Sequence, residues 1–340
     1  MSVERRQAVL YILLLVLPLP LAVYTIGLGR YEIAPGDVVR ALADWVTVGH
    51  NASDLPDLAY DIVIRVRLPR IAAAMLIGGN LAVTGAAFQG IFRNPLVDSN
   101  ILGVTSGAGF GAALMLLLKG STLEVQMSAF FFGMLAVLAA YAASRLYHTA
   151  PLLMLTLVGI VIGSFFSSLT SLLKYVADPL DALPAITYWL MGGLTSVTQR
   201  DLPMLGLISI TGMISLWLVR WRLNVLSMGD SEALALGLNP TRLKVIIILF
   251  STLMTAAAVS VGGVIGWVGL VVPHAARTLV GPSHLRLIPA TIAMGMVFLL
   301  LIDTLSRTML PGEVPLGVFT GIVGAPLLLI ILRVNKTGWK

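Results

Sequence analysis

Long apolar stretches separated by short polar segments dominate this sequence. A helix of about 20 apolar residues is long enough to cross the ~30 Å hydrocarbon core of a bilayer. Hydrophobic residues make up 58% of the chain and charged residues 11%, against about 45–50% and about 25% in soluble domains. The pattern predicts an all-α polytopic membrane protein, formed as a single domain over residues 1–340, and excludes both a soluble enzyme and a disordered chain. Ten segments are expected to cross or enter the membrane: 8–28, 69–89, 99–118, 125–146, 151–172, 202–219, 243–262, 264–274, 288–305 and 315–332.

The segment 264–274 is too short to cross the membrane as a helix. It is rich in Gly and Pro, which favours a broken or buried element, because irregular backbone inside a bilayer must be covered by protein. We therefore expect about ten transmembrane helices that include short or broken ones.

The distribution of Lys and Arg predicts the orientation of the chain. With the N-terminus inside, 13 of the 22 basic residues fall on the cytoplasmic side, as the positive-inside rule requires. Both termini are then cytoplasmic, residues 30–68 are external, and residues 220–242 form a cytoplasmic loop. The part of the external segment from Pro35 to Val46 is typical of a short amphipathic helix. The net charge of +6 is explained by this asymmetry, so we expect a lipid bilayer and no nucleic acid as partner.

Motifs for catalysis are absent from the sequence. There is no G-x-x-x-x-G-K-[ST] phosphate-binding loop, and the absence of cysteine removes disulfides, thiolate metal sites and cysteine nucleophiles. The four histidines lack metal-ligand spacing. We therefore expect no enzyme activity, no metal and no cofactor in this chain.

One ionisable residue, Asp303, lies within a predicted span. Intramembrane carboxylates often mark ion pathways, so an ion-coupled secondary transporter acting alone is one alternative. Arg307 lies four residues later, however, and an i,i+4 ion pair is the simpler interpretation.

The fifth span carries a face of small and hydroxylated residues. Such a face is typical either of a polar pathway or of close helix packing with interhelical hydrogen bonds, and the sequence leaves both open. The residues are Gly159, Gly163, Ser164, Ser167 and Ser168.

Six motifs of this sequence, in their order along the chain, resemble those of the FecCD family of ABC importer permeases. This family includes permeases for vitamin B12, haem and ferric siderophores. The six motifs are R-L-P-R at 67–70, G-A-A-F-Q-G-I-F-R-N-P-L at 85–96, I-L-G-V-T-S-G-A-G at 101–109, E-A-L-A-L-G-L at 232–238, G-V-I-G-W-V-G-L-V-V-P-H-A-A-R at 263–277 and E-V-P-L-G-V-F-T-G-I-V-G-A-P at 313–326. Together they cover most of the chain.

The resemblance implies a specific assembly and reaction. It implies ten helices per subunit, a homodimer with the pathway on its twofold axis, cytoplasmic ATP-binding subunits with the P-loop, and an external substrate-binding protein. The expected location is the bacterial or archaeal cytoplasmic (inner) membrane. The expected function is inward movement of a metal chelate (ferric siderophore, haem or cobalamin) by ATP-driven alternating access, with ATP hydrolysis on the separate subunit. An oxyanion such as molybdate is the alternative substrate.

The resemblance also assigns residues to three contacts. Arg67, Arg70 and Arg307 match arginines that pair with carboxylates of the binding protein. The fifth span matches the pathway-lining helix. Part of the cytoplasmic loop matches the helix that couples the permease to its ATPase, with Leu234, Leu236 and Leu238 as its apolar contact; the remaining coupling residues are Asp230, Glu232, Gly237 and Arg242.

Overall fold

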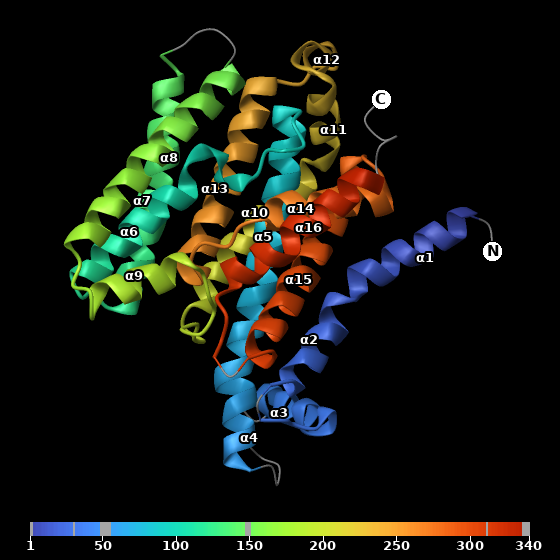
Figure 1. Ribbon diagram of the computed structural model, residues 1–340. Helices are drawn as coiled ribbons and strands as arrows, with labels where there is room; N and C mark the ends of the chain where they lie inside the picture. The colour runs from blue at the N-terminus through green and yellow to red at the C-terminus, as the bar shows by residue number, and fades with distance from the viewer. Residues whose placement is uncertain (1–2, 30, 48–55, 147–150, 311, 335–340) are drawn as a thin grey trace.

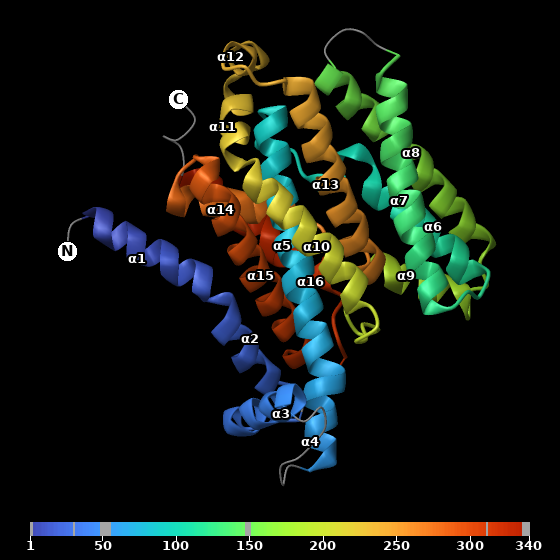
Figure 2. The same cartoon turned by 180° about the vertical axis from the view of Figure 1, so that it is seen from behind.

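The computed structural model describes residues 3–29, 31–47, 56–146, 151–310 and 312–334, and all of its regular elements are helices (Figures 1 and 2). The expected external segment 30–68 includes residue 30 and residues 48–55, which lie outside the described residues. The helices are α1 (Val3–Val16), α2 (Pro18–Gly27), α3 (Pro35–Thr47), α4 (Asp57–Asp61), η1 (Ile62–Arg67, a π-helix), α5 (Leu68–Phe92), η2 (Ser99–Leu102, a 3₁₀-helix), α6 (Val104–Leu117), α7 (Thr122–Ser144), α8 (Pro151–Val176), α9 (Ala182–Leu190), α10 (Leu202–Leu218), α11 (Arg220–Met228), α12 (Asp230–Ala235), α13 (Pro240–Gly262), α14 (Val268–Val280), α15 (His284–Thr308) and α16 (Leu316–Val334).

The predicted all-α membrane fold is confirmed. Among the described residues, seven helices are long and apolar enough to cross a membrane, and the α10–α11 pair, bent by 57°, makes an eighth. The shorter apolar helices α6 and α14 occupy the two remaining predicted segments. Each of the ten predicted apolar segments therefore contains a helix.

Helix α5 forms the centre of the bundle and is buried along nearly its whole length. Glycines allow its neighbours to approach at backbone distance. A Cβ atom at Gly78 would lie 2.2 Å from the carbonyl oxygen of Gly295 on α15, and one at Gly85 would lie 2.0 Å from that of Gly269 on α14. Small residues at such crossings supply the van der Waals contact that holds helices together in lipid.

Helices α6, α7, α8 and α9 form a second group beside this centre (Figure 1). Gly107 and Gly111 of α6 lie against the backbone of Phe132 and Ser128 on α7. Phe110, Phe132 and Phe166 join α6, α7 and α8 through ring contacts at centroid distances of 4.9–6.3 Å. These contacts leave one face of α8 uncovered within the chain.

The predicted segment 264–274 is broken, as its Gly and Pro content indicates, but its helical part is displaced. Residues 263–267 are not helical, and α14 begins at Val268 and continues to Val280. The backbone of Gly263 has a φ of +67° and passes so near Trp189 that a Cβ atom would lie 2.5 Å from its carbonyl oxygen. The irregular backbone is covered by protein, since Ile265 is buried and Gly193 donates a hydrogen bond to the carbonyl of Gly262.

The external segment contains the predicted amphipathic helix as α3. The second span starts earlier than the sequence predicts, because α4, η1 and α5 run on from Leu58 to Phe92 without a break. Residues of α2, α3, α4 and η1 form a separate small core around Ile26, Val38 and Val63. This core fixes the start of α5.

Helices α3 and α4 lie at one end of the molecule and α12 at the opposite end (Figure 1). We call these the outer and inner ends, following the predicted orientation.

Candidate functional site

Three buried arginines meet at the outer end. Arg70, at the start of α5, donates from Nε to Asp303 Oδ1 at 2.8 Å and from Nη1 to Glu313 Oε2 at 2.8 Å. Arg307 donates from Nε to the second oxygen of Asp303 at 3.1 Å. The predicted i,i+4 pair is therefore confirmed, and Asp303, which is fully buried, bridges two guanidinium groups.

Backbone carbonyls at the end of α2 accept further hydrogen bonds from the guanidinium groups of Arg67 and Arg307. Arg67 donates to the carbonyl oxygens of Ile26 at 2.7 Å, Gly27 at 3.1 Å and Tyr31 at 2.6 Å. Arg307 donates to that of Leu28 at 3.0 Å. The last carbonyls of a helix lack partners within it and carry partial negative charge, so two cations close the end of α2.

The three arginines predicted to dock the binding protein thus form one cluster with Asp303 and Glu313. We call these five residues the outer arginine cluster. Each arginine is buried within the chain, at 6–7% exposure. Direct pairing with an external carboxylate would require an exchange of partners, and the docking role stays a prediction.

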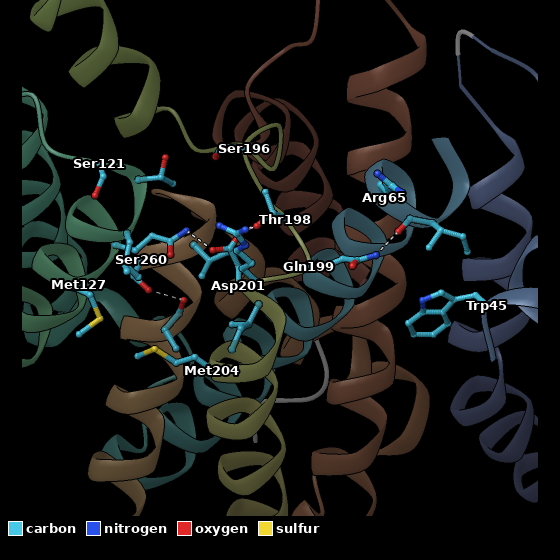
Figure 3. Close-up of a pocket in the computed structure, with 18 of the residues that line it drawn as sticks. Trp45, Arg65, Ser121, Met127, Ser196, Thr198, Gln199, Asp201, Met204 and Ser260 are labelled. Carbon is cyan, nitrogen blue, oxygen red and sulfur yellow. Dashed lines mark hydrogen bonds between the residues drawn. The ribbon is translucent and has the colours of Figure 1, made fainter. Parts of the chain in front are cut away.

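A cavity of about 910 Å³ opens at the outer end between η1, the start of α7 and the start of α10 (Figure 3). Asp201 orders its wall by accepting hydrogen bonds from Gln126 Nε2 at 3.0 Å and from the backbone N–H of Thr198 at 2.7 Å. Gln199 joins this wall to η1 through the carbonyl of Ile64 at 3.0 Å. No local sequence pattern predicts this cavity, because its lining comes from five separate stretches of chain.

The predicted coupling loop forms α11, α12 and the start of α13 at the inner end. Leu234 and Leu236 are 62% and 59% exposed, whereas Leu238 is half-buried and packs on the core. Gly237 ends the short helix with a φ of +74°, and the N–H of Leu238 bonds to the carbonyl of Ala233 at 2.9 Å. This C-terminal cap holds the two exposed leucines in a fixed turn.

The charged residues of the loop differ in their surroundings. Asp230 Oδ2 forms an ion pair with Lys244 Nζ at 2.6 Å, and this pair connects α12 to α13. Glu232 and Arg242 are exposed to solvent. All seven predicted coupling residues therefore lie together on α12, on the turn that follows it and on the first turn of α13.

The predicted pathway residues divide into two sets on α8. Gly159 and Gly163 are buried against the backbone between Ile101 and Gly103, so helix packing accounts for both. Three residues are exposed on the open face of the helix: Ser164, Ser167 and Ser168. Their pathway role stays a prediction.

A partly buried carboxylate positions the element on which α8 packs. Asp98 accepts hydrogen bonds from the backbone N–H and Nδ2 of Asn100 at 3.0 and 2.9 Å, and so begins η2. Burial raises the pKa of the Asp98 carboxyl, and these two hydrogen bonds oppose the rise. Gly159 of α8 then lies against the backbone of η2.

The model of the FecCD transport family matches residues 13–334. The chain belongs to this family. FecCD proteins are ABC importer permeases, and the predicted resemblance is confirmed. The ion-coupled secondary transporter is set aside, because members pair with ATPase and binding-protein subunits.

Relatives of known name agree with this family assignment. The molybdate import system permease protein MolB of Haemophilus influenzae is 36% identical, over 93% of each chain. A probable iron chelatin transport system permease protein of Helicobacter pylori is 39% identical, over 80% of this chain and 82% of the relative.

One solved structure is described as an inward-facing conformation of a metal-chelate type ABC transporter. It matches this chain with a TM-score of 0.82 and 35% identity, and the match covers 95% of this chain and 97% of the chain in that structure. Together with the apolar helices, these bacterial relatives identify a multi-pass protein of the inner membrane.

Proposed function

We propose that this FecCD permease moves a metal chelate inward, as one of two copies that enclose the pathway. The open face of α8 carries the proposal. From Leu152 to Leu173 the helix has no charged residue, and exposed serines alternate there with apolar side chains such as Ile160 and Phe165. A passage of this kind suits a bulky, largely apolar chelate, since it offers no fixed charge that would hold the cargo.

A second copy of the chain is the proposed cover for this face. Only 22% of the α8 span is buried within one chain. The Ser168 hydroxyl donates to the carbonyl of Ser164 at 3.0 Å, and the Ser167 hydroxyl donates to Ser106 Oγ of α6 at 3.3 Å. Packing between two copies would place Ser164, Ser167 and Ser168 on the shared axis.

The exposed leucines of the coupling loop are the proposed contact for the ATPase. Leu234 and Leu236 present apolar area on a charged surface, and the α11–α13 frame is rigid because of the Asp230–Lys244 pair and the Gly237 cap. A short rigid element can transmit closure of an ATPase to the helices behind it.

The outer arginine cluster is the proposed support for docking of the binding protein. Arg67, Arg70 and Arg307 place three guanidinium groups against two carboxylates, which gives the cluster one positive charge in excess. Such an excess steers an acidic partner and raises its association rate.

An oxyanion such as molybdate is the second candidate substrate, and the MolB relative favours it. Uptake into proteoliposomes that contain the permease, its ATPase and the binding protein distinguishes the two. We expect ATP-dependent uptake of ferric siderophore, haem or cobalamin and none of molybdate. Molybdate uptake alone would replace the proposed substrate, and uptake without ATP would overturn the mechanism.

A further inference from the structure

A second cluster of basic residues lies at the inner end, and none of the coupling residues belongs to it. A cavity of about 360 Å³ lies there between the end of α5, α11, α14 and the start of α15. Its lining includes Arg93, Arg277, His274 and His284 and contains no Asp or Glu. We call it the inner basic cavity.

Arg277 has no counter-charge among the described residues. Its Nη1 is buried without a hydrogen-bond partner, and no carboxylate of the described chain forms an ion pair with it. A cation that is partly removed from water without a counter-charge is destabilising, so the cavity favours entry of an anion. Arg93, exposed at the end of α5, adds a second guanidinium to the lining.

The cavity also offers hydrogen-bond acceptors. Asn224 Oδ1 accepts the backbone N–H of His284 at 2.7 Å, which fixes the orientation of the amide. The same oxygen lies 2.9 Å from His284 Nδ1, so Nδ1 carries the proton and Nε2 is an acceptor. That Nε2 is buried without a partner. A Cβ atom at Gly90 would lie 2.7 Å from it, so glycine is needed to admit the ring.

Gln89 supplies another acceptor. Its Nε2 donates to the carbonyl of Gly269 at 3.3 Å, which leaves Oε1 buried and without a partner. A ligand that fits the whole lining must therefore bring negative charge for the arginines and O–H donors for His284 and Gln89. A carboxylate or chloride brings only the charge, whereas a protonated phosphate brings both. A phosphatidylglycerol headgroup also brings both, since its glycerol hydroxyls act as donors.

We propose that the inner basic cavity binds a phosphate group, supplied either by inorganic phosphate or by the headgroup of an anionic inner-leaflet lipid. The site is independent of the transported substrate. Asn224 belongs to α11, which leads into the coupling loop, and also donates from Nδ2 to Ser283 Oγ at 3.2 Å. An occupied cavity would therefore fasten α11 to α5, α14 and α15, and so stiffen the connection between the ATPase contact and the helix bundle.

The test uses the full permease with its ATPase in nanodiscs. One arm adds inorganic phosphate to phosphatidylcholine discs, with chloride at equal ionic strength as reference. The other arm replaces part of the phosphatidylcholine with phosphatidylglycerol and omits phosphate. The melting temperature and the bound mass in native mass spectrometry are measured for the wild type, Arg277→Met, Arg93→Gln and the control Arg286→Gln, which changes an exposed arginine outside the cavity.

We expect the wild type and R286Q to be stabilised in at least one arm, and that arm identifies the source of the phosphate group. R277M should lose the shift, with affinity at least tenfold lower, and should melt higher than the wild type in phosphatidylcholine discs that contain neither inorganic phosphate nor phosphatidylglycerol. R93Q should weaken binding several-fold; because Arg93 is exposed, this variant keeps the test valid if R277M does not fold. Equal shifts in the wild type and both variants, or no shift in either arm, would overturn the proposal.

Discussion

The two ends of this permease differ in how their buried or partly buried arginines are paired. At the outer end Arg70 and Arg307 share the carboxylate of Asp303, and Arg67 is held by backbone carbonyls of α2 and the residues after it. At the inner end Arg277 has no ion-pair partner among the described residues, and Leu234 and Leu236 are exposed at the same end. The outer groups are paired within the chain, whereas we propose that the inner ones contact other molecules.

This difference indicates where each end obtains its stability. The outer cluster joins α2, α5 and α15 and so contributes to folding of the single chain. In our proposals, the groups at the inner end complete their favourable contacts with a partner or a ligand. Four substitutions test this contrast, from the largest expected effect to the smallest.

Replacement of Asp303 with Ala should have the largest effect. It leaves two buried guanidinium groups with one partly exposed carboxylate, and breaking a buried pair in this way costs about 3–5 kcal/mol. We expect a large fall in melting temperature in detergent and loss of the monodisperse peak on size exclusion.

The matched control for Asp303→Ala is Asp37→Asn, which removes an exposed pair with Arg40. Exposed pairs contribute about 0–1 kcal/mol, so its melting temperature should change little. Equal melting temperatures for both variants would show that the outer arginine cluster does not hold the fold.

Replacement of both Leu234 and Leu236 with Ser should release the ATPase. Central apolar contacts of an interface contribute about 2 kcal/mol or more each, so co-purification of the ATPase should fall more than tenfold. Both side chains are exposed, and the melting temperature of the permease alone should stay the same. Leu180→Ser, at a leucine that is 94% exposed outside the coupling loop, is the control. An intact complex would contradict the coupling role.

Glu313→Gln tests docking without removing an arginine. The carboxylate of Glu313 is partly exposed beside Arg70, so its neutralisation should cost only about 1 kcal/mol while the outer end becomes more positive. If charge steers the binding protein, its association rate should rise about two- to five-fold at low salt, and the gain should vanish at high salt. An unchanged association rate in surface plasmon resonance would show that the charge of the outer arginine cluster does not steer docking.

Gly237→Ala should have the smallest effect. Its φ of +74° lies in the left-handed region, while no atom lies within 4 Å of an added Cβ, so only backbone strain of about 1 kcal/mol is expected. The ATPase should dissociate slightly faster from this variant, because the turn that carries Leu236 loosens. Binding kinetics that match the wild type would show that the cap does not position the contact.

The sequence predicted the ten apolar segments of the bundle, but not the short helix α9 between them, and only part of the site. It placed Arg67, Arg70 and Arg307 on the outer side, and the family resemblance assigned a coupling role to residues that lie close together between Asp230 and Arg242, a role that stays a prediction. It missed the partner Glu313, because that contact joins residues 243 positions apart. It also missed Asn224, Gln89 and Arg277 as a group, because they come from three helices with no shared local pattern.

The sequence by itself determined that this chain lies in a membrane as about ten helical segments, and its motifs determined the family. Hydrophobicity and helix length act over consecutive residues, so they can be read locally. Tertiary structure alone decided which arginines gain a carboxylate and which do not. Burial and counter-charge depend on which helices pack together. In this bundle Gly78 and Gly85 of α5 allow α15 and α14 to pack closely against it.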